Sequence, residues 1–176
     1  MQPSNEDSVQ LHKKGAPSKV SFGLVIISTS RANNPDLEDK SYSVIKNILE
    51  LKNHFILEYK VVPDIIEEIR DHISQLLAND NIQVIITSGG TGLTKEDVTL
   101  EALSPLFEKE LTSFNPVFAF LSFKQVRAAA IMSRATAGIA HGKPIFCLPG
   151  SPKACQLAVE QIIVPEIGHI LKLVQK

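Results

Sequence analysis

Three of the nine glycines of this chain fall within four positions, directly after a short apolar run. The run, residues 82–86, is rich in β-branched side chains, and its length predicts a buried strand. The loop that follows, residues 88–99, combines the glycines with four hydroxyls and the carboxylate of Asp97. Glycine is used where the backbone takes a positive φ or lies close to a ligand. The loop therefore favours an anionic ligand, with a plain Gly-rich connection and a helix cap as the alternative.

The rest of the chain alternates between strand and helix patterns. Strands are predicted at residues 22–27, 55–62, 82–86 and 144–148, with a further strand or hairpin within 132–141. Helices are predicted at residues 40–51, 64–77, 100–111 with an interruption near Pro105, 122–130, and 152–174 with a kink at Pro165. Capping-box spacings, Asp64 with Glu67 and Ser122 with Gln125, mark the start of two of these helices. This order predicts an α/β layered fold with a largely parallel sheet.

The length and composition indicate one domain preceded by a polar arm. The 176 residues suit a domain of ordinary size, and 44% hydrophobic residues can supply a full core. Residues 1–19 are polar and show no periodicity, so they are predicted to be a flexible N-terminal arm. Residues 20–176 are predicted to form a single domain.

Charge and cysteine content argue against several classes of partner. The 18 Lys and Arg residues are balanced by 19 Asp and Glu residues, which gives no electrostatic reason to expect nucleic acid or an anionic membrane. No segment approaches 18 apolar residues and the N-terminus lacks a signal core, so we expect a cytoplasmic protein. Cys147 and Cys155 fit no zinc spacing. Cys147 is expected in the core and Cys155 on a helix.

Four predicted strands end in polar or Gly-rich segments. These segments are Ser28 to Arg31, Pro63-Asp64, Ser88 to Asp97, and Pro149 to Pro152. Parallel strands of an open α/β sheet bring such ends together along one edge, where ligands bind. Each segment also has a purely structural explanation, since Asp64 and Ser151 are competent helix caps and Pro152 suits a first helical position. Their coincidence on one edge favours a binding site.

Two carboxylates lie on this predicted edge, those of Asp64 and Asp97. A pair of carboxylates beside phosphate groups suits Mg²⁺, which is held by one or two carboxylates together with substrate phosphates and water. Such a site would serve phosphoryl or nucleotidyl transfer. Two solvated carboxylates with no metal are the alternative.

Three motifs in register resemble a known family. They are Ser88-Gly-Gly-Thr-Gly-x-x-x-x-Asp97-Val-Thr99, Ser133-Arg-Ala-Thr-Ala-Gly138 and Leu148-Pro-Gly-Ser-Pro-Lys-Ala154. Together they resemble the molybdenum cofactor biosynthesis proteins of the MoaB/MogA type, to which the molybdopterin-binding G domains of gephyrin and its plant counterpart are similar. The resemblance covers residues 20–172. It implies a three-layer α/β sandwich with a mostly parallel central sheet, assembled as a homotrimer or a trimer-based hexamer.

The resemblance also implies a substrate and a site. Molybdopterin is expected at the strand edge, at Ser28, Asp39, Ser41, Ser88, Gly89, Gly90, Thr91, Gly92, Thr99, Ser133, Arg134, Pro149, Gly150, Ser151 and Pro152. Active members are adenylyltransferases, in which the terminal phosphate of molybdopterin attacks the α-phosphate of Mg-ATP and pyrophosphate leaves. The family's required aspartates match Asp64 and Asp97, which are expected to be catalytic and to hold Mg²⁺. A molybdenum-inserting protein of the same pathway is a further candidate partner.

The chain departs from the family pattern at two places. Tyr42 stands after Asp39-Lys-Ser41 where glycine is usual, and Ala119 stands where relatives commonly have arginine. These departures motivate an alternative function, a catalytically inactive scaffold that holds molybdopterin without turnover. A nucleotide-pyrophosphatase domain of the competence-damage type, which shares the fold, is the lowest-ranked alternative.

Overall fold

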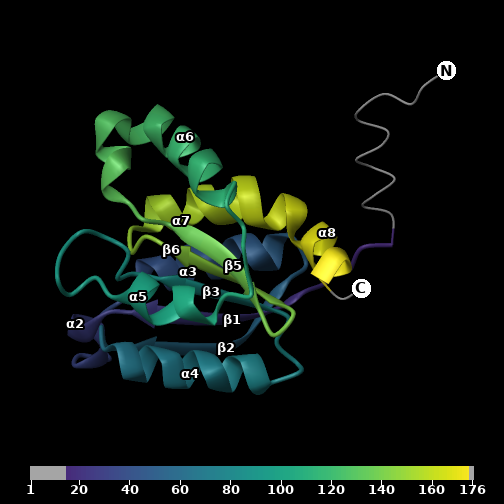
Figure 1. Ribbon diagram of the computed structural model, residues 1–176, viewed down its shortest axis with the longest axis horizontal. Coiled ribbons are helices and arrows are strands. Elements are labelled where there is room, and N and C mark those ends of the chain that lie inside the picture. Colours follow the sequence, from purple (N-terminus) through teal and green to yellow (C-terminus); the bar gives the residue numbers. More distant parts are fainter. Residues whose placement is uncertain (1–14, 175–176) are drawn as a thin grey trace.

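The sheet has six strands in the order β2-β1-β3-β6-β5-β4, and the first four of this order, from edge strand β2 to β6, are parallel (Figure 1). The strands are β1 (Ser21–Ile27), β2 (Phe55–Val62), β3 (Val84–Ser88), β4 (Lys109–Glu110), β5 (Thr136–Ala140) and β6 (Lys143–Leu148). Strand β5 runs antiparallel to β6, and β4 runs antiparallel to β5. This computed structural model describes residues 15–174, so most of the predicted arm, residues 1–19, lies outside the described residues.

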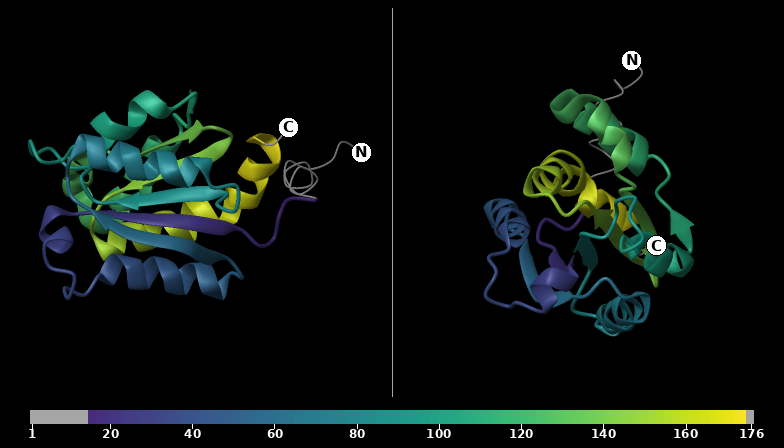
Figure 2. Two further views of the ribbon diagram at one scale, coloured as in Figure 1. Left: turned by 90° about the horizontal axis from the view of Figure 1, so that it is seen from below. Right: turned by 90° about the vertical axis from the view of Figure 1, so that its left-hand side faces the viewer.

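Helices cover both faces of the sheet and make it the middle of three layers (Figure 2). The α-helices are α2 (Thr29–Ala32), α3 (Lys40–Leu51), α4 (Ile66–Ala78), α5 (Thr99–Leu103), α6 (Phe114–Val126), α7 (Pro152–Ala158) and α8 (Val164–Val174). Alternate side chains of each central strand enter opposite cores. Leu24 and Ile26 of β1 pack in the core that contains α3, α7 and α8, whereas Val25 and Ile27 pack in the core that contains α4 and α5. The predicted three-layer α/β fold is confirmed.

Several sequence predictions match the structure closely. The predicted helix at 40–51 and the predicted strand at 55–62 coincide with α3 and β2. A strand or a hairpin was predicted within residues 132–141. These residues contain β5, which forms a hairpin with β6. A π-helical segment, η3 (Val159–Ile163), separates α7 from α8. It lies just before Pro165, the residue at which a kink is predicted, and the missing N–H of this proline disfavours regular α-helical bonding there.

The predicted helix at 100–111 is wrong in its second half. Helix α5 ends at Leu103, a 3₁₀ turn η1 (Ser104–Leu106) follows, and the chain then enters edge strand β4. Pro105 favours the break. The ring of Phe107 then packs so closely on Gly138 of β5 that a Cβ at this glycine would lie 2.3 Å from the ring. This contact draws the chain out of the helix and along the sheet edge.

The predicted short helix at 122–130 begins much too late. Helix α6 starts at Phe114, so Ser122 lies in mid-helix and the capping box predicted there is wrong; the 3₁₀ segment η2 (Arg127–Met132) continues from its end. Its apolar side chains are spread over all sides of the helix, so it lacks the one-faced pattern by which helices are recognised. Its anchors are Phe114 and Phe118, which are buried against the body. Strand β3 also begins two residues later than predicted and extends to Ser88.

Among residues 15–174, no helix is both long enough and apolar enough to cross a membrane.

Two buried histidines couple the fold to pH. Burial lowers the pKa of His72 below its usual 6.5, with Lys60 adding to the effect and Glu58 opposing it. Burial likewise lowers the pKa of His54, whose Nδ1 accepts a 3.2 Å hydrogen bond from the backbone N–H of Val20. Both rings are therefore neutral in the folded protein at pH 7. Protonation favours the unfolded chain, in which the histidines keep their ordinary pKa.

We predict that the stability contributed by these neutral histidines is fully present above pH 6.5 and is lost as the pH falls below it, because the unfolded state then binds more protons. Urea unfolding between pH 8 and pH 5 measures this trend. A His72→Leu variant, which cannot be protonated, should show a shallower loss than the wild type. If the free energy of unfolding falls equally with pH in both proteins, His72 does not contribute to the pH dependence of stability.

Candidate functional site

The four parallel strands end together at one edge of the sheet, as the sequence predicted. The backbone N–H of Ser28, after β1, donates to the Val62 carbonyl at the end of β2, at 2.9 Å. The N–H of Gly89, after β3, donates to the Leu148 carbonyl at the end of β6, at 3.0 Å. Together with the pairing of β1 and β3, these bonds make the ends of β2, β1, β3 and β6 one continuous edge.

Gly89 holds the loop after β3 against the neighbouring strand. Its φ is +114°, and a Cβ built there would lie 2.1 Å from the carbonyl oxygen of Ile27. No side chain can be accommodated at that distance, so glycine is required both by the backbone angle and by the close approach. The next residue, Gly90, lies beside Asp64, whose Oδ1 is 3.2 Å from the position that a Gly90 Cβ would take.

Several predicted binding hydroxyls are used inside the fold. Thr99 is buried, and its Oγ1 donates to the Gly89 carbonyl at 2.8 Å. Ser88 is also buried, and its Oγ donates to the Pro149 carbonyl at 3.2 Å. The Ser41 hydroxyl donates to the Gly150 carbonyl at 3.0 Å. These three side chains fix the two Gly-containing loops to each other and to α3.

The carboxylate of Asp64 is fastened to the turn after β1. Its Oδ2 accepts hydrogen bonds from the backbone N–H and the hydroxyl of Thr29, at 2.7 and 2.8 Å. The Thr29 hydroxyl oxygen in turn accepts a 3.0 Å bond from the Asp64 N–H. The N-cap of α4 is Ile65, without a side-chain capping bond. The predicted capping role of Asp64 is therefore wrong, because Thr29 takes the carboxylate instead.

The carboxylate of Asp97 is fastened within its own loop. Its Oδ2 accepts bonds from the N–H and hydroxyl of Thr94, at 2.9 and 2.7 Å. Partial burial alone would raise the pKa of Asp97, but these bonds, a backbone bond from Gly92 and the charge of Arg134 together lower it. Asp97 is therefore an anion at neutral pH.

Two adjoining cavities occupy this edge. A polar cavity of about 310 Å³ is lined by Ile26, Ile27, Ser28, Arg31, Ser41, Asp64, Ser88, Gly89, Glu96, Asp97 and Gly150. A second, more apolar cavity of about 420 Å³ lies between the Gly loop, α6, η2 and α7. Its lining includes Gly89 to Gly92, Asp97, Phe118, Met132, Ser133, Pro149 to Ser151 and Lys153. Both cavities share Gly89, Asp97 and Gly150.

The structure thus brings most of the predicted site residues together. Four of them line neither cavity: Asp39, Thr99, Arg134 and Pro152. Asp39 caps α3 by accepting from the Tyr42 N–H at 3.0 Å, and Pro152 is the first residue of α7, which Ser151 caps as predicted. Arg134 lines a separate cavity on the outer side of the 92–98 loop.

Sequence reasoning missed three charged residues of the two cavities. Lys153 lines the apolar cavity, and Arg31 and Glu96 line the polar one. Lys153 directly follows Pro152 in the third family motif, and Arg31 ends the segment after β1. The available signal for Lys153 was its position directly after the Ser151-Pro152 pair that starts a helix. For Arg31 it was the position at the end of the polar segment that follows a strand. Both can supply positive charge to an anionic ligand.

The described residues contain no group of three or more His, Cys, Asp or Glu side chains that could by itself hold a metal ion. Asp64 and Asp97 offer two carboxylates in one cavity. This donor set fits Mg²⁺ only when oxygens of a substrate complete the coordination, which is the usual arrangement for Mg²⁺ with phosphates.

Tyr42, the first departure from the family pattern, is accommodated without disturbing the carboxylates. Its ring packs on Tyr59, with centroids 4.2 Å apart. The Tyr59 hydroxyl donates to Asp39 Oδ2 at 3.4 Å. Burial and the negative charge of Asp39 raise the pKa of Tyr59 to about 12. Ala119, the second departure, is half-buried on α6.

Comparison with known proteins identifies the class of protein to which the chain belongs. The family model described as "Probable molybdopterin binding domain" matches residues 23–169. The chain belongs to this family, as its motifs suggested.

Individual relatives extend over nearly the whole chain. Molybdenum cofactor biosynthesis protein B of Halalkalibacterium halodurans is 38% identical over 170 residues, covering 96% of this chain and 98% of the relative. A Pyrococcus furiosus protein named molybdopterin adenylyltransferase is 40% identical over 174 residues, covering 93% and 96%. The crystal structure of the tungsten cofactor synthesizing protein MoaB from Pyrococcus furiosus has a TM-score of 0.83 and 38% identity, covering 92% of this chain and all of that one.

We predict that Gly89→Ala is strongly destabilising, because it combines a positive φ with overlap of the Ile27 carbonyl. A matched control is Gly142→Ala, where φ is +69° and the nearest atom is 4.0 Å away. The control should cost about 1 kcal/mol, and Gly89→Ala at least about 3 kcal/mol. Chemical denaturation measures both, and equal losses would show that the close approach is not a constraint.

Proposed function

We propose that this protein is a molybdopterin adenylyltransferase of molybdenum cofactor biosynthesis, acting on molybdopterin and ATP. The observation that carries the proposal is the pair of adjoining cavities, which share Gly89, Asp97 and Gly150. Such a pair can hold two substrates side by side with their reacting groups at the shared boundary. Relatives that cover nearly the whole chain bear this activity in their names.

In the reaction, a phosphate oxygen of molybdopterin bonds to the α-phosphorus of ATP, and the bond to the departing pyrophosphate breaks. The products are adenylyl-molybdopterin and pyrophosphate. The phosphate groups suit the polar cavity, where Arg31 offers positive charge, and the apolar cavity offers Lys153 beside apolar walls. The main contribution of the protein is then positioning of the two substrates and stabilisation of their charges.

Mg²⁺ would be held by Asp64 and Asp97 together with substrate oxygens, and when bound it neutralises charge on the phosphates. The protein's own part is to keep both carboxylates in fixed positions. Thr29 does so for Asp64 and Thr94 for Asp97, each through two hydrogen bonds.

The inactive-scaffold alternative rests on Tyr42 and Ala119. Tyr42 packs on Tyr59 on the outer side of Asp39 and lines neither cavity. Ala119 also lines neither of them. Since both aspartates are present and fastened, we favour the active enzyme.

We further propose that the protein is cytoplasmic and forms a homotrimer or a trimer-based hexamer, with a molybdenum-inserting protein as a later partner. Helix α6 supports association, because its apolar side chains are spread over all sides and only one side is covered. Exposed apolar residues on α6 and η2 are Val117, Phe120, Phe123, Val126, Ile131 and Met132, with Phe120 61% and Ile131 82% exposed. Figures 1 and 2 show α6 outside α7, as the outermost helix on that side. A large apolar surface of this kind marks an interaction site.

Incubation of the protein with molybdopterin, ATP and Mg²⁺ should yield adenylyl-molybdopterin, and Asp97→Asn should lower the rate at least about 100-fold, because a charge that acts on the reacting phosphates is lost. Molybdopterin binding should persist. The control is Asp71→Asn, the same change at an exposed position of α4, which should keep wild-type activity. A folded, pterin-binding wild type that makes no product would support the scaffold instead.

Light scattering should give a mass three or six times the 19.3 kDa of one chain. Phe120→Glu should shift the mass towards the monomer, since it places a charge in the proposed contact. The matched control is Leu51→Glu, at an exposed apolar residue of α3, which should leave the mass unchanged. A monomeric wild type would rule out the assembly, and an unchanged Phe120→Glu oligomer would place the contact elsewhere.

A further inference from the structure

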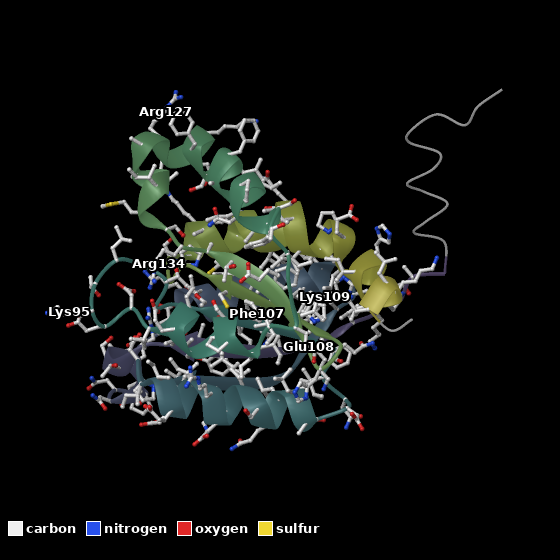
Figure 3. All side chains as sticks on the ribbon, in the orientation of Figure 1. Lys95, Phe107, Glu108, Lys109, Arg127 and Arg134 are labelled. Carbon is white, nitrogen blue, oxygen red and sulfur yellow. The ribbon has the colours of Figure 1, made fainter. Side chains whose placement is uncertain are left out.

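Arg134 reaches across to the loop that carries Asp97. It lies in the segment that leads into β5, and Figure 3 shows it near the base of the loop, with Lys95 at the tip. Its backbone N–H donates to the Thr91 carbonyl at 3.0 Å. Its Nε donates to the Gly92 carbonyl at 2.7 Å, and an Nη donates to the Asp97 carbonyl at 2.8 Å. One guanidinium therefore joins the start and the end of the loop.

The same guanidinium is also held from the other side. It forms a two-pronged ion pair with the carboxylate of Glu101 on α5. Its donors are thus shared among two carbonyls of the loop and one carboxylate of the following helix. A guanidinium has five N–H donors in one rigid plane, whereas a lysine ammonium is a compact point charge and cannot reproduce this arrangement.

The base of the loop is closed by Thr99, whose N–H and Oγ1 donate to the Gly90 and Gly89 carbonyls at 3.0 and 2.8 Å. The Asp97 carboxylate is bonded to Thr94, which belongs to the same loop, and Leu93, Thr94, Lys95 and Glu96 are exposed. A bond within the loop fixes its local shape but not its place relative to the sheet. Gly89 and Thr99 place the base of the loop, and Arg134 adds the tie from Gly92 and Asp97 to the segment that leads into β5.

We propose that Arg134, held by Glu101, is a positioning residue that sets the location of Asp97, and not the substrate contact that its motif suggested. The effect on turnover rests on the proposed function. The placement of the loop does not, and it can be measured without any substrate.

The kinetic test compares Arg134→Ala with Arg70→Ala. Arg70 is a matched control, because it also donates to α5, at the Glu101 and Ala102 carbonyls, both at 2.9 Å. Arg134→Ala should lower kcat for adenylylation about 30-fold or more, since small displacements of a reacting geometry are costly. Its molybdopterin Kd, measured without ATP or Mg²⁺, should stay within about twofold of wild type. Added guanidinium ion at millimolar concentration should restore part of the rate, and Arg70→Ala should retain activity.

The proposal is overturned if Arg134→Ala weakens molybdopterin binding tenfold with kcat unchanged, which would make Arg134 a substrate contact. It is also overturned if Arg70→Ala loses as much activity, because general support of α5 would then suffice.

Trypsin cleavage after Lys95 provides the readout that is independent of activity. Cleavage at this site should be faster in Arg134→Ala than in the wild type or Arg70→Ala, since the loop is no longer held. If Arg134→Ala does not fold, Arg134→Lys should show a smaller decrease in kcat and a smaller increase in the rate of cleavage after Lys95. Equal cleavage rates in a folded variant would contradict the positioning role even if the enzyme is active. A protein without adenylylation activity but with faster cleavage would sink only the proposed function.

Discussion

Gly89 lies so close to β1 that one additional carbon atom would overlap the carbonyl oxygen of Ile27. This approach brings the loop after β3 between the ends of β1 and β6, where Gly89 bonds to Leu148. The loop then separates the edge of the sheet into two spaces with a shared boundary. A side chain at this position would move the loop outwards and remove the boundary, so the arrangement of the site depends on one missing Cβ.

Buried hydroxyls keep that arrangement in place. The carbonyls of Gly89, Pro149 and Gly150 accept bonds from Thr99, Ser88 and Ser41 respectively. The three hydroxyls are buried and need such partners, because an unpaired polar group in the interior is costly. These hydroxyls are therefore used by the scaffold, whereas the half-buried carboxylates of Asp64 and Asp97, with the exposed Glu96, line the polar cavity. One set of side chains thus holds the loops in place, and a different set faces a cavity.

Sequence reasoning succeeded where local pattern determines structure. The α3 region has a clear apolar face and an Asp39 cap, and it was predicted at its observed bounds. Helix α6 was missed because its apolar side chains are spread over all sides, and β4 because its two residues depend on the contact between Phe107 and the distant Gly138. In the site, glycines and carboxylates at strand ends revealed the location. The partner of the Asp64 carboxylate and the Arg134–Glu101 ion pair could not be predicted, since Thr29 is 35 positions from Asp64 and the Arg134 side chain meets Glu101 across 33 positions.

The anchoring of the two carboxylates has a consequence for folding. Asp64 follows β2 and is tied to the turn after β1, whereas Asp97 belongs to the loop after β3. The ends of these strands come together only in the complete sheet, in which β1 lies between β2 and β3. A partly unfolded chain that has lost either pairing has no site. A ligand that binds both carboxylates therefore recognises only the complete sheet, and by mass action it protects the central strands as one cooperative unit against opening.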